Sequence, residues 1–231
     1  DVKERCELPN LDHLTKEVLE TVYEPSEDTY LLLDALQSEI PRILAIKPAF
    51  IVEVGPGSGV VTACLARELR KAGYRGAVHL CVDVNPTACE TTLKTVISAM
   101  DGIGGGPVVV ETVCGDLLQP FLARLKGLID VFIMNPPYVP TPSDEVAKGG
   151  IAAAWAGGED GREVVDRIFP QLGHLLSPTG LAYFVVERAN RPSDFQSKLS
   201  AVGLSIATPI AARRAHNERL NIVRFERERK V

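Results

Sequence analysis

The segment 131–138 (VFIMNPPY) joins a hydrophobic run to an amide, two prolines and an aromatic ring. The side-chain oxygen of Asn135 and the carbonyl of Pro136 are hydrogen-bond acceptors. Two acceptors that hold both N–H groups of a planar nitrogen would orient it and stabilise the positive charge that develops in a displacement reaction. Prolines fix φ and remove competing N–H donors, and Tyr138 offers a flat face. The segment therefore predicts a clamp for a planar nitrogen, although Asn-Pro is also a common turn signal.

A glycine-rich segment, residues 53–59 (EVGPGSG), follows one apolar run and precedes a helix-like one. Its glycines, Gly55, Gly57 and Gly59, permit positive φ and let a ligand approach the backbone. A dinucleotide site favours G-x-G-x-x-G and a bare helix N-terminus, but this turn is G-x-G-x-G with Glu53 before it. That carboxylate would repel a pyrophosphate and could face a cation. The turn thus favours S-adenosylmethionine over NAD.

Two acidic residues follow the next two strand-like runs. Asp83 ends the second run, where an acid can hydrogen-bond both ribose hydroxyls of a nucleotide. The alternative is a carboxylate that stabilises the N-terminus of the helix beginning near Pro86. Asp116, after the third run, is placed to reach an adenine amino group, or else it forms a turn after Gly115.

Strand-like and helix-like runs alternate along the chain, which predicts a mainly parallel sheet covered by helices on both faces. Such sheets bind ligands beyond the carboxyl ends of their strands, where the residues above fall. The last two strand-like runs, joined by a polar connection, predict an antiparallel pair. The expected strands are Phe50–Gly55, His79–Val84, Val108–Cys114, Val131–Met134, Leu181–Glu187, Leu204–Arg213 and Asn221–Glu228.

Three helices between these strands carry start signals. The first spans Ser58–Ala72, and Asn85 caps a second that begins at Pro86. We expect a third over Arg162–Leu176, opened by an Asp160/Glu163 capping box and kinked at Pro170. A Ser193/Gln196 capping box opens a further helix that ends near Gly203.

Composition narrows the class of protein. The chain has 231 residues, of which 45% are hydrophobic and 24% charged, as in a soluble globular domain. Its net charge of −5, with only short basic clusters, argues against stable binding to a nucleic-acid backbone. No secretory leader and no apolar stretch of about 20 residues is evident, so we expect no membrane span.

The cysteines predict neither a disulfide framework nor a metal site. Five are present, and no two have CxxC spacing. An odd number without such a pattern indicates a reducing compartment, and we expect a cytoplasmic protein, with the nucleus left open as a second location. The cysteines are Cys6, Cys64, Cys81, Cys89 and Cys114.

The clamp and the glycine turn together resemble those of class I S-adenosylmethionine-dependent amino-methyltransferases. Residues 23–29 (YEPSEDT), 139–142 (VPTP) and 153–163 (AAWAGGEDGRE) narrow the match to the eukaryotic and archaeal branch of the HemK family. The resemblance covers about residues 20–228. It implies a Rossmann-like, seven-stranded sheet with five parallel strands, a C-terminal antiparallel pair and helices on both faces. It also implies one methyltransferase domain, residues 23–231, after an N-terminal extension, residues 1–22.

The family's functional residues carry over by position. Its catalytic subunit methylates the side-chain amide (N5) of the glutamine in the Gly-Gly-Gln loop of a class I translation release factor. The resemblance implies catalytic roles for Asn135, Pro136 and Tyr138, and substrate contacts from these three and Pro137. It implies cofactor contacts from Thr29, Glu53, Gly55, Asp83, Asp116, Leu117 and Asn135, to which we add Gly57 and Gly59 of the glycine turn.

The family also implies a partner. Its catalytic subunit works with a small zinc-binding activator protein, so any metal belongs to that partner and not to this chain. We expect the partner to add to the sheet edge near Val108–Cys114, where it would satisfy exposed backbone groups. Some relatives are associated with histone lysine methylation, so histone is a second candidate substrate.

Two other functions stay open at the sequence level. A nucleic-acid adenine N6-methyltransferase could use the same clamp, but such enzymes usually carry basic and aromatic surfaces for the strand. A nucleotide-binding scaffold without catalysis would not need the clamp. The chain departs from the family pattern in a glycine-rich loop, residues 101–107, and in a basic stretch, residues 187–192; the role of the first twenty residues is open.

Overall fold

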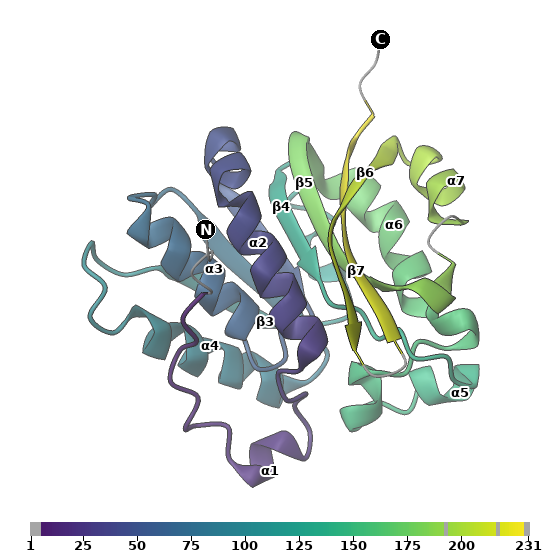
Figure 1. Ribbon diagram of the computed structural model, residues 1–231, viewed down its shortest axis with the longest axis horizontal. Coiled ribbons are helices and arrows are strands. Elements are labelled where there is room, and N and C mark those ends of the chain that lie inside the picture. The colour runs from purple at the N-terminus through teal and green to yellow at the C-terminus, as the bar shows by residue number, and fades with distance from the viewer. Residues whose placement is uncertain (1–5, 192–193, 216–217, 229–231) are drawn as a thin grey trace.

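The computed structural model describes residues 6–191, 194–215 and 218–228, and these build one seven-stranded sheet between two layers of helices (Figure 1). The strand order is β3-β2-β1-β4-β5-β7-β6. Strands β1 to β5 pair in parallel, whereas β7 is antiparallel to both β5 and β6. The predicted architecture is confirmed. The strands are β1 (Phe50–Val54), β2 (Val78–Asp83), β3 (Val109–Cys114), β4 (Ile129–Met134), β5 (Leu176–Glu187), β6 (Leu204–Ala215) and β7 (Glu218–Arg227).

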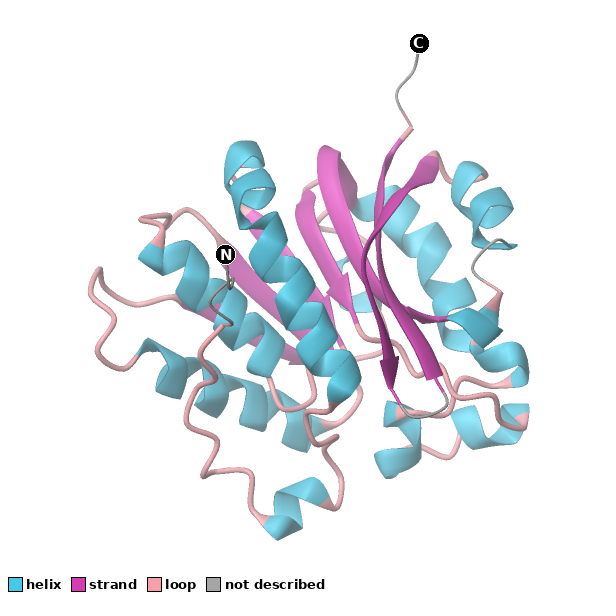
Figure 2. Cartoon of the chain, viewed as in Figure 1, coloured by secondary structure: helices cyan, strands magenta, loops and turns pink. Residues whose placement is uncertain are grey.

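Helices cover the sheet on both faces (Figure 2). On one face lie α2 (Glu27–Ile46) and α3 (Val60–Lys71), whose apolar side chains form one core with the sheet, and α4 (Pro86–Met100) packs beside α3. On the other face α6 (Glu163–Leu175) and α7 (Phe195–Ser200) form a second core. The short elements are α1 (Lys16–Leu19), α5 (Ser143–Val146) and the 3₁₀ turns η1 (Gln119–Phe121), η2 (Gly150–Ala154), η3 (Glu159–Gly161) and η4 (Arg188–Asn190).

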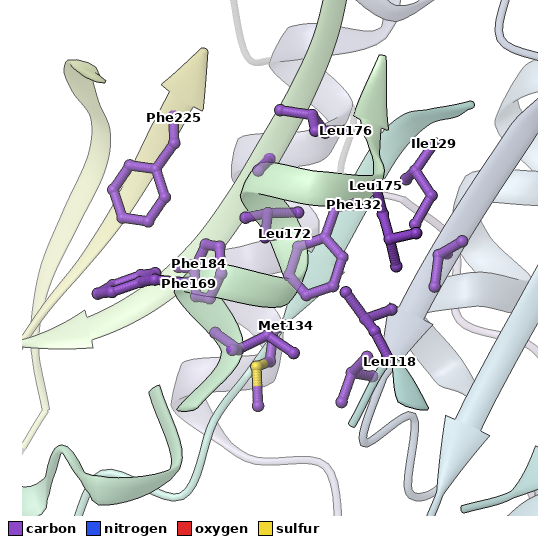
Figure 3. Packing of buried hydrophobic residues seen from close by; sticks show 14 of the residues in the cluster. Leu118, Ile129, Phe132, Met134, Phe169, Leu172, Leu175, Leu176, Phe184 and Phe225 are labelled. Atoms are coloured by element: carbon purple, nitrogen blue, oxygen red, sulfur yellow. The ribbon is translucent and has the colours of Figure 1, made fainter. Parts of the chain in front are cut away.

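The alternation of side chains along the strands explains the two cores. On β4, Val131 and Ile133 join the core under α2 and α3, while Phe132 and Met134 join the core under α6. Successive residues of a strand point to opposite faces, so strands buried on both sides read as unbroken apolar runs. Figure 3 shows Phe132, Phe184 and Phe169 packed together in the second core.

The switch point of the sheet lies between β1 and β4. Strand β1 pairs with β2 on one side and with β4 on the other. The connections from these strands therefore leave toward opposite faces, and a crevice opens at their carboxyl ends. The glycine turn follows β1 and Asn135 follows β4, so the fold brings both predicted motifs to this crevice.

Several predicted helix boundaries need correction. The Asp160/Glu163 capping box is wrong: Asp160 has φ +56 in η3, and Arg162 precedes α6. The Glu163 carboxylate instead accepts a hydrogen bond from the Glu159 amide at 2.9 Å. Helix α6 continues through Pro170 to Leu175, and β5 begins at the next residue, five residues earlier than expected.

The helix expected after Ser193 is α7, which spans six residues and ends at Ser200. Pro192 and Ser193 lie outside the described residues, so that capping box stays untested. The cap on α4 is confirmed, because the Asn85 side chain accepts a hydrogen bond from the Thr87 amide at 2.9 Å.

Helix α2 is the main element without a sequence prediction. It runs for 20 residues through Pro41 and buries Leu31, Leu32 and Leu36 against the sheet. Its first turn holds residues of the YEPSEDT stretch, so this helix places that motif beside the crevice.

The glycine-rich loop 101–107 is fastened to the body of the domain. The buried guanidinium of Arg70 on α3 donates hydrogen bonds to the carbonyls of Gly105 and Pro107, the latter at 2.8 Å. Among the described residues, no helix has the length and apolar character needed to cross a membrane.

Candidate functional site

The carboxyl ends of β1, β2, β3 and β4 border a cavity with about 1220 Å³ of empty space, which we call the first cavity. It lies at the switch point predicted from the sequence. Its lining comes from the glycine turn (55–58), the strand ends (82–85, 115–117 and 134–135), residues 21–23 before α2, and Val146, Gly150, Ala153, Ala154 and Ala156 after β4.

A second cavity, of about 990 Å³, adjoins the first. Tyr23, Asn135 and Ala154 line both cavities. Pro136 and Tyr138 line the second only, and Pro137 lines the first only. The Asn-Pro-Pro-Tyr segment is thus a partition between two spaces, with Asn135 at their junction. A site that brings two reactants together needs this division.

Two glycines of the turn leave their faces open to the first cavity. Gly55 and Gly57 have φ +70 and +53, and a Cβ on either would meet no atom within 4 Å. Gly59 is different: it is not a lining residue, and a Cβ there would stand 2.5 Å from the Cα of Thr92 on α4. At Gly59 the structure therefore shows close packing of α3 on α4, and its cofactor contact stays a prediction.

Glu53 lies beneath the turn and is only 3% exposed. The hydroxyl of Thr62 on α3 donates a hydrogen bond to its carboxylate. Burial, with a smaller effect from Asp83, raises the pKa of Glu53 to about 7. A carboxyl group at this wall without a cationic partner is suited to a cationic ligand, as the sequence predicted.

Asp83 is held by backbone donors at the end of β2. Its carboxylate accepts hydrogen bonds from the Asn85 amide at 2.9 Å and the Gly57 amide at 3.3 Å. Burial raises the pKa of Asp83, although these hydrogen bonds oppose the shift. Asp83 lines the first cavity and also braces the glycine turn, so both sequence interpretations describe part of its position.

Asp116 and Leu117 follow β3 and line the same cavity. Asp116 forms an ion pair with Arg167 of α6, a partner that the sequence did not indicate. Leu117 is 5% exposed and has φ +50, a strained conformation for a branched side chain that costs about 1–3 kcal/mol. Such strain is common where backbone must face a ligand.

Asn135 has one buried polar atom without a partner among the described residues. Its Nδ2 donates to the Asp28 carboxylate at 2.9 Å, whereas its Oδ1 is buried and has no hydrogen bond. A carboxylate can only accept, so Asp28 fixes which end of the amide faces it. The unpaired acceptor therefore belongs to a residue that lines both cavities, as the clamp hypothesis requires.

Asp28 is the centre of this arrangement and is 3% exposed. Besides Asn135, its carboxylate accepts hydrogen bonds from the hydroxyls of Tyr23 and Tyr138, both at 3.3 Å. The amide of Thr29 donates to it at 2.6 Å. Thr29 itself lines the first cavity, as the family resemblance implies.

Tyr138 is fixed at both ends. The single proton of its hydroxyl is shared between Asp28 and the Glu218 carboxylate, 3.2 Å away, and its carbonyl accepts a hydrogen bond from the Asn190 side chain at 2.9 Å. Burial, with the nearby carboxylates of Asp28 and Glu218, raises the pKa of Tyr138. The ring therefore stays neutral and rigid, and Asn190 gives the basic stretch 187–192 a function in positioning the clamp.

Sequence reasoning missed three residues of this site. Tyr23 and Asp28 belong to a stretch that was used only to identify the family, and Glu218 comes from a distant β-hairpin. The available signal was an acidic residue in the first turn of a helix after Ser26, although its partner cannot be read from spacing. In the described part of the chain, no three His, Cys, Asp or Glu side chains form a group that could hold a metal ion.

Comparison with known proteins places the chain among methyltransferases. No family model matches it. It is 42% identical over 219 residues to methyltransferase HEMK2 of Mus musculus, covering 95% of this chain and 96% of the relative. It is 32% identical over 224 residues to the eRF1 methyltransferase catalytic subunit mtq2 of Schizosaccharomyces pombe, covering 95% of each chain.

A solved structure agrees with these relatives. The E. cuniculi Mtq2–Trm112 complex, which is described as responsible for methylation of the eRF1 translation termination factor, superposes with a TM-score of 0.58 at 29% identity. The alignment covers 90% of this chain and 99% of that one.

The pKa of Glu53 predicts how stability depends on pH. Between pH 4.5 and about 7 the unfolded chain ionises this group while the folded protein keeps it protonated, so the folded state loses stability as pH rises. We expect Glu53→Gln to raise the free energy of unfolding of the ligand-free protein by up to about 3 kcal/mol at pH 8. At pH 5 the gain should fall below about 1 kcal/mol. Urea denaturation at both pH values measures this, and an equal effect at both would contradict it.

Asp28→Asn tests how the amide is oriented. The new asparagine side chain can take two orientations. In each, its NH₂ group would face another donor, either the Thr29 backbone amide or the Asn135 side-chain amide. The orientation of the Asn135 amide, and hence of its oxygen, would therefore be disturbed. We expect kcat to fall about 10²-fold or more, with the affinity for S-adenosylhomocysteine changed only a few-fold. Glu27→Gln, which removes a charge in the same cavity and lies in an ion pair with Arg213, not with Asn135 or Tyr138, is the matched control. Unchanged kcat in Asp28→Asn would show that Asp28 does not position the clamp.

Proposed function

The chain belongs to the HEMK2 and Mtq2 family of S-adenosylmethionine-dependent methyltransferases, and from this premise we propose its substrate and the roles of its residues. It transfers a methyl group to the side-chain amide nitrogen (N5) of the glutamine in the Gly-Gly-Gln loop of a class I release factor. It acts as the catalytic subunit of a heterodimer. The names of its relatives support this assignment, since they include an eRF1 methyltransferase catalytic subunit and a protein N5-glutamine methyltransferase.

The observation that carries the proposal is the free Oδ1 of Asn135. A buried acceptor without a donor costs about 1–3 kcal/mol, so this atom is suited to a ligand N–H. Asn135 lines both cavities, and this oxygen is buried without a partner among the described residues. A glutamine side chain that enters through the second cavity could donate one N–H to Oδ1 and the other to the carbonyl of Pro136.

The residues of the first cavity fit S-adenosylmethionine. The open faces of Gly55 and Gly57 admit a ligand beside the backbone, and the Glu53 carboxyl faces the cation. Asp83 would hold the ribose, and Asp116 with the backbone of Leu117 would hold the adenine. When bound, the cofactor supplies an electrophilic methyl group.

The clamp acts on charge and orientation. An amide nitrogen is a poor nucleophile because its lone pair is conjugated. Methyl transfer to this nitrogen would exchange a carbon–sulfur bond for a carbon–nitrogen bond and place positive charge on the nitrogen until one of its protons is released to solvent. Acceptors on its N–H groups would stabilise that charge. Asn135 and Pro136 are fixed before the reaction, so little reorganisation is needed. The neutral ring of Tyr138 provides a flat surface beside the planar amide.

The clamp chemistry separates the alternative substrates only in part. The amino group of adenine is planar and would fit the same acceptors, but the relatives are protein methyltransferases. A lysine side chain of a histone carries a tetrahedral ammonium group, which lacks the planar face that the clamp matches. We therefore rank glutamine first and keep histone as a second candidate substrate.

We also propose that the activator partner docks on β3. This strand forms one edge of the sheet, and Val109 on it is 51% exposed. Ile97, on the neighbouring helix α4, is 66% exposed. The opposite edge, β6, carries Pro209 and two register shifts, which hinder strand addition. Edge β3 lacks such protection, so a partner can pair with it. The zinc ion that we expect in the assembly would belong to that partner.

Methyl transfer to three acceptors tests the function. Purified chain, with and without a Trm112 partner, is given radiolabelled S-adenosylmethionine and a release factor, a histone or adenine-containing DNA. We expect label on the release factor, and none when its Gly-Gly-Gln glutamine is replaced by alanine. Asn135→Ala should abolish transfer while affinity for S-adenosylhomocysteine largely survives, because the lost acceptor acts mainly in the transition state. Label only on histone or DNA would overturn the assignment.

A matched pair of surface variants tests the docking edge. Val109→Lys puts a charge on β3, and Leu128→Lys puts one on another exposed apolar residue, 47% exposed, before β4. We expect Val109→Lys to weaken binding to the Trm112 partner at least about tenfold and Leu128→Lys to leave it unchanged. Titration calorimetry measures both. Equal affinity for the two variants would place the interface elsewhere.

A further inference from the structure

Residues 6–22, which we call the N-terminal strap, lie along helices α3 and α4 before the chain enters α2. Figure 1 shows this purple segment running beside both helices to α1. Its helix α1 contains no buried residue, whereas Cys6 and Leu11 pack against the edge of the core under α2 and α3 and Val22 is buried. Hydrogen bonds add to this packing: the Ser98 hydroxyl on α4 donates to the Asn10 carbonyl at 3.1 Å. A segment held in this way has low local stability, so small changes in its contacts decide whether it is docked.

His13 provides the shortest of these contacts. Its Nε2 lies 2.7 Å from the hydroxyl oxygen of Thr95, which is fully buried on α4. The Thr95 hydroxyl also lies 2.6 Å from the carbonyl of Ser58 and 3.0 Å from that of Thr91. The Thr95 hydroxyl has a single proton, and which group donates between it and His13 depends on the histidine tautomer. With that proton on the Ser58 carbonyl, His13 is the donor, and the contacts His13–Thr95–Ser58 run from the strap to the glycine turn.

The far end of the strap forms a wall of the first cavity. The Asn85 side chain, which caps α4 two residues after Asp83, donates to the Thr21 carbonyl at 2.8 Å. Thr21 and Val22 line the first cavity, and Val22 is 2% exposed. Tyr23, the next residue, lines both cavities and donates to Asp28. The strap is thus hydrogen-bonded through His13 to Thr95, which in turn bonds the glycine turn, and through Thr21 to the cap of α4 beside Asp83. It leads directly into the clamp.

We propose that the N-terminal strap is part of the cofactor site and that His13 is the positioning residue that docks it. Docking places Thr21 and Val22 against the bound nucleotide and, through Thr95, holds the Ser58 carbonyl and the glycine turn. Cofactor binding and strap docking then favour each other, since a ligand that binds only the docked state stabilises that state. The proposal rests on the cofactor site and not on the choice of methyl acceptor, so its failure would leave the proposed substrate untouched.

The test compares His13→Ala, His13→Gln and His174→Ala in the full chain. His174 is an exposed histidine on α6, distant in sequence from the strap, and serves as the matched control. Calorimetry measures the Kd for S-adenosylhomocysteine, and hydrogen–deuterium exchange measures protection of residues 6–22. We expect His13→Ala to raise the Kd about tenfold, the scale of one hydrogen bond, and to speed exchange in the strap. His13→Gln, whose side-chain amide can donate, should recover much of both, and His174→Ala should match the parent protein.

A double-mutant cycle separates positioning from general loss of stability. Thr95→Val removes the hydroxyl to which His13 donates, so His13→Ala in that background should have little further effect on Kd. Thr95→Ser, which keeps the hydroxyl, should restore the effect of His13→Ala. S-adenosylhomocysteine should slow strap exchange in the parent protein. Three results would each overturn the proposal. They are an unchanged Kd in His13→Ala, additive effects of the two substitutions on Kd, and hydrogen exchange of the strap that is the same with and without S-adenosylhomocysteine.

Discussion

The hydrogen bond from Asn135 to Asp28 is the interaction on which the site depends. It joins the end of β4 to the first turn of α2, two elements more than a hundred residues apart in sequence. Because the carboxylate only accepts, the bond turns the Asn135 oxygen away from Asp28, and this oxygen has no partner among the residues that the structure describes. Two tyrosines and the Thr29 amide hold Asp28 in turn. A flexible amide thereby becomes an acceptor of fixed direction.

The same site keeps other groups in unfavourable states. Glu53 is buried and forms no ion pair within the described part of the chain, and Leu117 has a strained positive φ. Both features reduce the stability of the ligand-free protein, and both residues line the first cavity. A bound cationic nucleotide would stabilise the Glu53 carboxylate and could contact the Leu117 backbone. The two packed cores on either side of the sheet offset these costs. A rigid doubly wound sheet suits this purpose, because the ligand lies beyond the strand ends and not within the cores.

The sequence predicted the sheet better than the helices around the site. Apolar runs bounded by glycine, proline and acidic residues marked the strands. A strand that is buried on both faces has apolar side chains on both, so its sequence is a continuous apolar run. The 20-residue α2 was missed although it buries several leucines. The Asp160/Glu163 capping box failed because Glu163 bonds to a neighbouring turn, and Gly59 serves packing because α4 approaches it closely. These contacts come from segments distant in sequence, which local patterns do not contain.

By itself, the sequence determined the class of chemistry. The Asn-Pro-Pro-Tyr segment predicts a clamp, and the glycine turn with the acids after two strands predicts a nucleotide site. These predictions need only residue types, spacings and local backbone geometry. Only the tertiary structure decided which end of the Asn135 amide is free, which glycines face the ligand, and that residues before α2 complete the wall. The physical reason is that residue type and local conformation are written along the chain. The partner of a buried hydrogen bond, by contrast, is chosen when helices and strands pack.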